Sequence, residues 1–314
     1  MAMPSLFVAH GSPMLAVEDD AYTAFLQNLG QELVARFHPR AIVLFTAHWT
    51  TRRPTISAVD GTYAMIYDFY GFPEALYHIV YPARGLPSLA ETVLTRFRAA
   101  GFEAATDDQR GLDHGSWVVL RRMFPSAEIP VVQASVVPWF SPEQLYRMGK
   151  ALRPLRDEGV LLIGSGGTVH NLMSLRWESG DAAEGWAVAF DDWLLARTAA
   201  RDHADLFDYR KTAPHAMQAV PTPEHLAPYW IAFGAGDASE EEEESRISRF
   251  APSGGTVHAL PETVKRSTER AAADALGGTR QGNQVLFRAY QYGSLSLMTL
   301  TFGDAASDGM AAMG

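Results

Sequence analysis

The stretch AIVLFTAH at residues 41–48 joins an uninterrupted apolar run to a histidine that follows it directly. A short apolar run without polar alternation is typical of a strand buried on both faces of a sheet. Runs of the same kind occur at four other places: Ser5–Ala9, Ile129–Ser135, Val160–Gly164 and Ser294–Phe302. Together with Ala41–Ala47, these runs predict the strands of a central sheet.

Amphipathic patterns lie between the predicted strands. Residues Tyr22–Phe37 and Leu86–Ala100 each repeat apolar side chains at the spacing of one helix face. Ser141 followed by Pro142 is typical of an N-cap with a proline in the first helical position, which predicts a third helix. Strands that alternate with helices of this length predict an α/β protein whose sheet is covered on both faces.

The composition is that of a soluble globular enzyme. The 314 residues carry a formal net charge of -10, include 47% hydrophobic residues and contain no cysteine. The acidic balance argues against a nucleic-acid partner, because it repels phosphate groups. No basic residue precedes Arg36 and no apolar run reaches membrane-spanning length, so we expect a cytoplasmic protein without a membrane partner. Without thiolates, any metal must be held by nitrogen and oxygen atoms.

Three of the predicted strands are followed by a histidine at or just beyond their carboxyl ends: His10, His48 and His170. Ligands of open α/β sheets bind at that edge. One such histidine alone is more often a hydrogen-bonded structural residue, but the repetition favours a shared metal site. Imidazole is the commonest nitrogen ligand, and an all-oxygen magnesium or calcium site is the main alternative.

A fourth histidine, His114, lies in the turn-rich segment Gly111–Trp117. The flanking glycines permit close approach of the backbone to a ligand, and either Asp113 or Ser116 is suited to orient the imidazole. An ordinary turn explains the same residues equally well.

A fifth histidine, His225, follows Pro221-Thr222-Pro223-Glu224. Thr222 as N-cap with Pro223 in the first helical position would project His225 from the first turn of a helix. In that arrangement the carboxylate oxygens of Glu224 are an alternative to the imidazole of His225 as metal ligand.

Aromatic residues are close to these histidines in sequence, among them Trp49, Trp117 and several in the irregular segment Tyr67–Pro73. Most aromatic side chains belong to a core, yet a flat apolar pocket with Tyr67–Pro73 as a lining loop explains the same pattern.

One segment breaks the alternation of strands and helices. Residues from Asp237 to about Asn283 contain the run Glu240–Glu244 and few large apolar side chains, which predicts an exposed insertion at 238–283. Within it, Ser253–Leu260 repeats Ser165–Leu172 at seven of eight positions, and we expect its histidine, His258, to lie outside the site.

Taken together, these motifs resemble one family, the class III extradiol ring-cleaving dioxygenases of the 4,5-DOPA dioxygenase type. The matching segments are HGSPM at 10–14, AHW at 47–49, YDFYGFP at 67–73, LDHGSW at 112–117, VHNL at 169–172, PTPEH at 221–225 and YGSLS at 292–296. The resemblance implies one catalytic domain over 1–314, a three-layer α/β/α sandwich around a central mixed, mostly parallel sheet.

The same resemblance implies the roles of the site residues. It places a divalent metal on His10, His48 and His225, with Fe(II) expected for activity and Zn(II) able to occupy the same ligands. It makes His170 the acid/base residue, with His114 beside it. Catechol and O2 are then the reactants, and the residues expected to contact the substrate are Ser12, Trp49, Tyr67, Phe72 and Trp117.

Two other functions explain the same histidines. A zinc-dependent hydrolase would use them to activate water, and a non-enzymatic interaction protein would keep the metal without turnover. Related class III enzymes complete their iron site with a glutamate, so Glu224 stays an alternative to His225. The particular catechol, the ring bond cleaved and the oligomeric state are not encoded in any motif.

Overall fold

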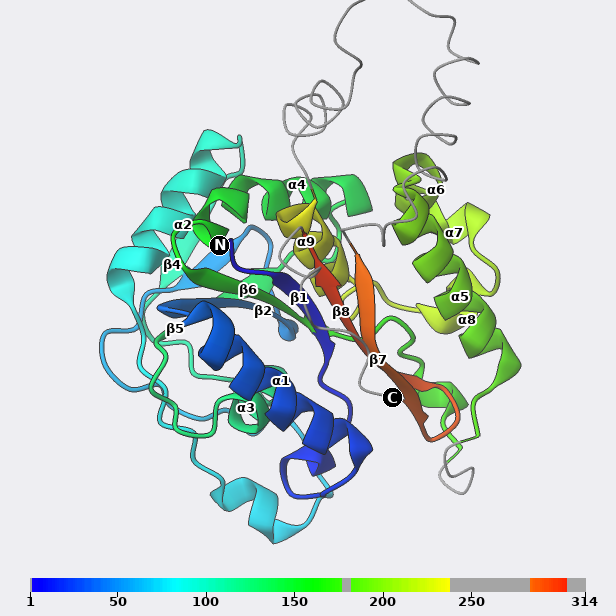
Figure 1. The fold of residues 1–314 in the computed structure, drawn as a ribbon, viewed down its shortest axis with the longest axis horizontal. Helices are drawn as coiled ribbons and strands as arrows, with labels where there is room; N and C mark the ends of the chain where they lie inside the picture. Colours follow the sequence, from blue (N-terminus) through cyan, green and yellow to red (C-terminus); the bar gives the residue numbers. More distant parts are fainter. Residues whose placement is uncertain (1, 177–181, 238–282, 304–314) are drawn as a thin grey trace, which may run out of the picture. The chain divides into compact units, whose positions relative to one another are not determined.

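In the computed structural model, which describes residues 2–176, 182–237 and 283–303, eight strands form one sheet in the order β4-β3-β5-β2-β6-β1-β8-β7 (Figure 1). The strands are β1 (Ser5–Ala9), β2 (Ala41–Thr50), β3 (Thr55–Ser57), β4 (Ala105–Asp107), β5 (Val131–Val136), β6 (Val160–Gly166), β7 (Gln284–Gln291) and β8 (Leu295–Phe302).

The centre of the sheet is parallel and its edges are mixed. β2 pairs in parallel with β5 and β6, and β6 pairs in parallel with β1. β8 runs antiparallel to β1 and to β7, and β3 runs antiparallel to β5. The carboxyl ends of β1, β2 and β6 therefore meet at one edge of the sheet, where the histidine-bearing segments emerge.

Helices cover both faces of the sheet (Figure 1). One hydrophobic cluster joins the sheet to α1 and α3, and a second cluster joins it to α2, α4, α5, α6 and α9. The helices are α1 (Ala21–Phe37), α2 (Pro87–Ala99), α3 (His114–Met123), α4 (Pro142–Leu152), α5 (Gly185–Ala200), α6 (His203–Phe207), α7 (Tyr209–Thr212), α8 (Ala216–Ala219) and α9 (Ala227–Gly236). Short 3-10 turns are η1 (Pro13–Ala16), η2 (Glu74–His78), η3 (Arg153–Arg156) and η4 (Leu172–Ser174).

The predicted three-layer α/β/α fold with a mixed, mostly parallel sheet is confirmed. The Ser141 N-cap is also confirmed, because its hydroxyl accepts from the Gln144 backbone and the Gln144 side chain accepts from the Ser141 backbone. The strand that begins at Ala41 is longer than predicted and runs through His48 to Thr50. The strands β3, β4 and β7 were not predicted, because two of them have three residues each and the third mixes polar and apolar side chains at an edge of the sheet.

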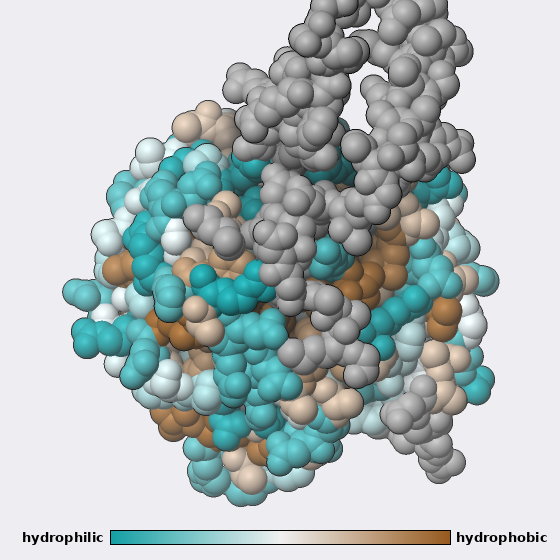
Figure 2. All heavy atoms as spheres, in the orientation of Figure 1, coloured by the Kyte–Doolittle hydropathy of each residue, from teal (hydrophilic) through white to brown (hydrophobic). Residues whose placement is uncertain are grey.

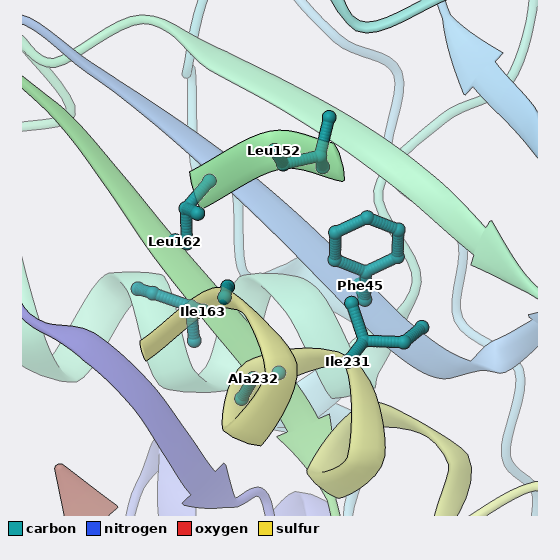
Figure 3. Close-up of a pocket in the computed structure, with 8 residues that line it drawn as sticks. Phe45, Leu152, Leu162, Ile163, Ile231 and Ala232 are labelled. Atoms are coloured by element: carbon teal, nitrogen blue, oxygen red, sulfur yellow. The ribbon is translucent and has the colours of Figure 1, made fainter. Parts of the chain in front are cut away.

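An apolar gap between β2, β6, α4 and α9 is lined by Phe45, Leu162 and Ile231 among others (Figure 3), and a gap without polar partners is a packing feature of the core. The visible face of the molecule is mainly hydrophilic, with smaller apolar areas between (Figure 2). In the described part of the chain, no helix has the length and apolar character needed to cross a membrane.

Candidate metal centre

Five histidines gather where the central strands end. His10 directly follows β1, His48 lies in β2, His114 is the first residue of α3, His170 follows β6, and His225 precedes α9. The His10 ring centroid lies 4.8 Å from that of His48, 5.5 Å from that of His114 and 5.3 Å from that of His225. The three histidines expected after strands and the two expected in loops therefore form one cluster.

The partner of His10 fixes its tautomer. The Ser165 hydroxyl, at the end of β6, donates its proton to the Gly115 carbonyl, so its oxygen accepts from His10 Nδ1 at 3.1 Å. A neutral His10 that carries its proton on Nδ1 presents an unprotonated Nε2 to the centre. His10 as a residue is 2% exposed, so its protein partners rather than solvent decide the state of the ring.

Asp68 fixes the tautomers of two further imidazoles. One of its oxygens lies 2.9 Å from His114 Nδ1, and the other lies 3.1 Å from His48 Nδ1. A carboxylate accepts only, so both rings carry a proton on Nδ1, and in the neutral form of each ring Nε2 is then free for a metal. Burial alone would raise the pKa of Asp68, but the hydrogen bonds from His114 and His48 hold that pKa far below its ordinary value.

The Nε2 atoms of His10 and His48 approach to 3.0 Å. When both rings are neutral with the proton on Nδ1, this contact brings two lone pairs together, which is unfavourable unless a cation lies beside them. Two nitrogens that bind one ion at right angles, each about 2.1 Å from it, are roughly 3.0 Å apart. The pair therefore fits the donor set of a divalent metal.

His225 brings a third unprotonated nitrogen to the cluster. Its Nδ1 lies 3.2 Å from Glu224 Oε1, and its Nε2 is buried without a hydrogen-bond partner. The prediction that Thr222 caps a helix before His225 is wrong. The helix begins at Ala227, and the Thr222 hydroxyl instead bonds Glu224 at 2.7 Å, which holds that carboxylate against His225.

A glycine allows the His225 segment to approach the sheet. A Cβ on Gly166, the last residue of β6, would lie 2.2 Å from the His225 carbonyl oxygen, and the neighbouring Gly167 N–H donates to that oxygen at 2.8 Å. Only glycine fits this backbone contact. The glycine-rich segment after β6 therefore docks the loop of His225 against the strand.

Two groups of side chains place potential ligand atoms within 4.8 Å of one another: His10, His48 and His114 form one, and His170, Glu224 and His225 form the other. The His170 and His225 rings stack with centroids 3.4 Å apart and an interplanar angle of 7°. Among the described residues, no hydrogen bond to another side chain holds the His170 ring.

Burial keeps four of these imidazoles neutral. It lowers the pKa of His10 and of His225 well below the ordinary value, and the neighbouring histidines add to the effect. Burial also lowers the pKa of His114 and, with the charge of His48, lowers the pKa of His170 to about 4. Neutral imidazoles are the state in which histidine binds metals or accepts protons.

We therefore expect the metal-free protein to lose stability as the pH falls below about 6.5, the ordinary histidine pKa. The unfolded chain takes up protons there, while the folded chain does not until lower pH, so the free energy of unfolding falls by about 1.4 kcal/mol per pH unit for each such histidine. Urea unfolding of the metal-free protein at pH 7 and pH 5.5 measures this slope. The variant His170→Gln should reduce the slope, and equal stability of the unsubstituted protein at both pH values would contradict the burial argument.

The prediction that Asp113 or Ser116 orients His114 is wrong, and so is the placement of His114 in a loop. Asp113 is the N-cap of α3, and its carboxylate accepts from Ser116 N at 3.1 Å and from Thr46 Oγ1 at 2.8 Å. It also pairs with Arg110 at 2.9 Å. Asp113 thus fixes the start of the helix that carries His114, and Asp68 orients the imidazole itself.

Three residues expected to contact the substrate have partners within the protein. The Ser12 hydroxyl accepts from Met14 N at 3.3 Å as the N-cap of η1. Trp49 is 6% exposed, with the Arg110 guanidinium 5.3 Å from the centroid of its ring. Trp117 is fully buried and donates to the Ile66 carbonyl.

The segment Tyr67–Pro73 forms no helix or strand, as expected of a lining loop. The Tyr67 hydroxyl donates to the Ile79 carbonyl at 2.7 Å, and its ring lies 6.2 Å from Trp117. Phe69 lies 5.7 Å from the His114 ring, and Phe72 lies 5.5 Å from Phe69. Phe69 is thus the aromatic side chain of this loop that comes nearest to a histidine of the cluster.

A buried cluster of neutral imidazoles at the carboxyl edge of a parallel sheet is the arrangement of a metal-dependent enzyme. Residues 4–260 match the family described as the catalytic LigB subunit of aromatic ring-opening dioxygenase. The chain belongs to this family and is an extradiol ring-opening dioxygenase, an oxidoreductase that incorporates oxygen.

Curated relatives agree with this assignment. The chain is 39% identical over 241 residues to the 4,5-DOPA dioxygenase extradiol of Beta vulgaris, covering 76% of this chain and 89% of the relative. It is equally similar, at 39%, to the Escherichia coli K12 protein of the same name, covering 76% and 87%. A crystal structure of an uncharacterized Escherichia coli K12 protein superposes with a TM-score of 0.71 at 28% identity, covering 96% of this chain and all of that chain.

Proposed function

We propose that the protein opens the ring of a catechol with dioxygen at a non-haem Fe(II) held by His10, His48 and His225, with His170 as the acid/base residue. The observations that carry this proposal are the 3.0 Å separation of the His10 and His48 Nε2 atoms, the His225 ring 5.3 Å from that of His10 and 5.1 Å from that of His48, and the buried His225 Nε2 without a partner. Three neutral imidazoles with occupied Nδ1 atoms are a donor set for a divalent metal.

His114 is the competing third ligand, because its ligand atom lies within 4.8 Å of those of His10 and His48. We assign it instead to the substrate side of the centre. Its ring is bordered by Phe69 at 5.7 Å, and the lining loop of Phe69 is a suitable wall for an aromatic substrate.

The acid/base role of His170 rests on its state and position. Its low pKa leaves the ring neutral at pH 7, ready to accept a proton from a catechol hydroxyl. It stacks on the proposed ligand His225, so a substrate beside the metal is within reach. After ring opening, the protonated His170 returns a proton to an oxygen of the product, which restores the enzyme.

The metal supplies what these side chains lack. Bound Fe(II) provides positions for both catechol oxygens and an electron source that makes dioxygen reactive. Zn(II) suits the same imidazoles but has no accessible redox change. We therefore propose iron as the active metal and zinc as an inactive occupant.

The substrate class follows from the relatives, which are named 4,5-DOPA dioxygenases. We propose a catechol with a side chain as the substrate class. Reconstitution with Fe(II) under anaerobic conditions, followed by a screen of catechols for oxygen uptake and coloured ring-opened products, tests the proposal. Turnover of esters or amides by the zinc-loaded protein, without oxygen uptake, would instead indicate a hydrolase.

We also propose that the insertion is dispensable; residues 238–282 lie outside the described part of the chain. The two residues that flank this segment lie near the carboxyl end of α5. Asp237 pairs at 3.4 Å with Arg201, which directly follows α5, and Asn283 donates at 3.1 Å to the carbonyl of Thr198 in its last turn. A short linker can join two ends held so close together.

Replacement of 238–282 by a glycine/serine linker is therefore expected to preserve metal binding and ring cleavage, because loop-closure entropy varies slowly with length. Metal analysis and oxygen uptake of the deletion variant measure this. A variant that folds, by circular dichroism, but binds no metal would give the repeated segment Ser253–Leu260 and its His258 a role at the centre.

A further inference from the structure

Asp68 serves two imidazoles of the centre with its two oxygens. Oδ1 accepts from both the backbone N–H and the Nδ1–H of His114, each at 2.9 Å. Oδ2 accepts from His48 Nδ1 at 3.1 Å. The carboxylate thus receives three donors, two from the first residue of α3 and one from β2.

We propose that Asp68 is a positioning residue that holds His48 with its proton on Nδ1, and thereby sets the metal affinity of the centre. This inference rests on the proposed function for the identity of the ligands. Asp68, which belongs to the lining loop Tyr67–Pro73, also holds His114 with its proton on Nδ1. The loop that borders the substrate side and the ligand on β2 are therefore joined through one side chain.

The requirement is for a carboxylate and not merely for a polar side chain of this shape. An asparagine at position 68 has one acceptor oxygen and one NH2 group. Its oxygen can keep both donors of His114, which leaves the NH2 group facing His48 Nδ1. A ring nitrogen that faces a donor must accept, so the proton of a neutral His48 moves to Nε2 and blocks the nitrogen that would bind the metal.

The test compares Asp68→Asn with Asp68→Ala and with the control Asp60→Asn, which changes an exposed carboxylate in the same way. The affinity of the metal-free proteins for Co(II) and Zn(II) is measured by competition with a chelator. Nitrogen-15 NMR of the histidine rings reports which nitrogen is protonated. We expect Asp68→Asn to weaken metal binding about 10–100-fold and to move the His48 proton to Nε2, while His114 keeps its proton on Nδ1.

Asp68→Ala removes the acceptor without adding a donor, so its loss of affinity should be no larger than that of Asp68→Asn. A purely structural Asp68 gives the opposite order, because asparagine preserves the shape and alanine does not. Normal metal affinity of Asp68→Asn, an unchanged His48 tautomer, or a wild-type protein that binds neither metal would each overturn the inference. A third outcome separates the two proposals. If the wild type binds metal and Asp68→Asn binds it more weakly, but the Fe(II)-loaded wild type consumes no catechol, the proposed function fails and the role of Asp68 stands.

Discussion

Alanine at His10, His48 or His225 is expected to remove the metal and to abolish ring cleavage. Each substitution deletes one of three nitrogens, and the two that remain bind a labile divalent ion weakly. The loss of affinity should exceed the roughly 10–100-fold typical of residues that only support a ligand. Metal content after gel filtration and the dissociation constant for Co(II) measure it.

Three other variants are controls for these substitutions: one changes an exposed histidine, and two change neighbours of the proposed ligands. His78→Ala changes an exposed ring and should leave metal content unchanged. His114→Ala and Glu224→Ala should retain metal, the latter with reduced affinity because Glu224 supports His225 at 3.2 Å. If His114→Ala is empty while His225→Ala stays loaded, the third ligand is His114 and the assignment of His225 is wrong.

Replacement of His170 by glutamine is expected to keep the metal and to lower turnover by about 10²–10⁴-fold, the usual contribution of general acid/base catalysis. Glutamine keeps a planar group over the His225 ring, on which His170 stacks at 3.4 Å, but it cannot take up a proton from the substrate. Catechol binding should change much less than turnover, because the interaction is made during proton transfer. Steady-state oxygen uptake and metal content of the same preparation are the measurements.

Each other outcome for His170 has a distinct meaning. Loss of metal from both His170→Gln and His170→Ala would make His170 a ligand, in keeping with its place in the group with Glu224 and His225. Turnover close to that of the wild type would show that the His170 ring takes no part in proton transfer and has only a structural role. Either result would contradict the proposed mechanism.

Sequence patterns predicted the centre of the fold well, because buried parallel strands carry continuous apolar runs. The predicted run Ser5–Ala9 is the strand β1. The predicted run Val160–Gly164 lies in β6, which continues for two more residues to Gly166. The short strand Thr55–Ser57 was missed, because its pairing with β5 and β4 is a property of the tertiary structure rather than of three residues. Edge strands with mixed polarity give an equally weak local signal.

The histidines of the cluster were found from sequence, but their partners were not. Position near the carboxyl end of a strand places His10 and His48 at one edge of the sheet, and the topology then brings His114 and His225 to them. Asp68 and Ser165 were not given a role, because nothing local to either residue shows which ring it will face. The one available signal was a lone carboxylate within the aromatic segment Tyr67–Pro73, where a buried charge needs partners. The role of Asp113 was predicted wrongly, because the same residue type caps helices and orients imidazoles.

The most direct test of the account is the mass of the product formed by the Fe(II)-loaded protein from a catechol under 18O2, with rapid borohydride reduction to prevent exchange of the new carbonyl oxygen with water. A dioxygenase that uses the His10, His48 and His225 centre should place both labelled atoms in the ring-opened product, and His10→Ala should give none. A ring-opened or cleaved product without labelled oxygen, formed equally well by the zinc-loaded protein, would show that the oxygen comes from water and would contradict the account.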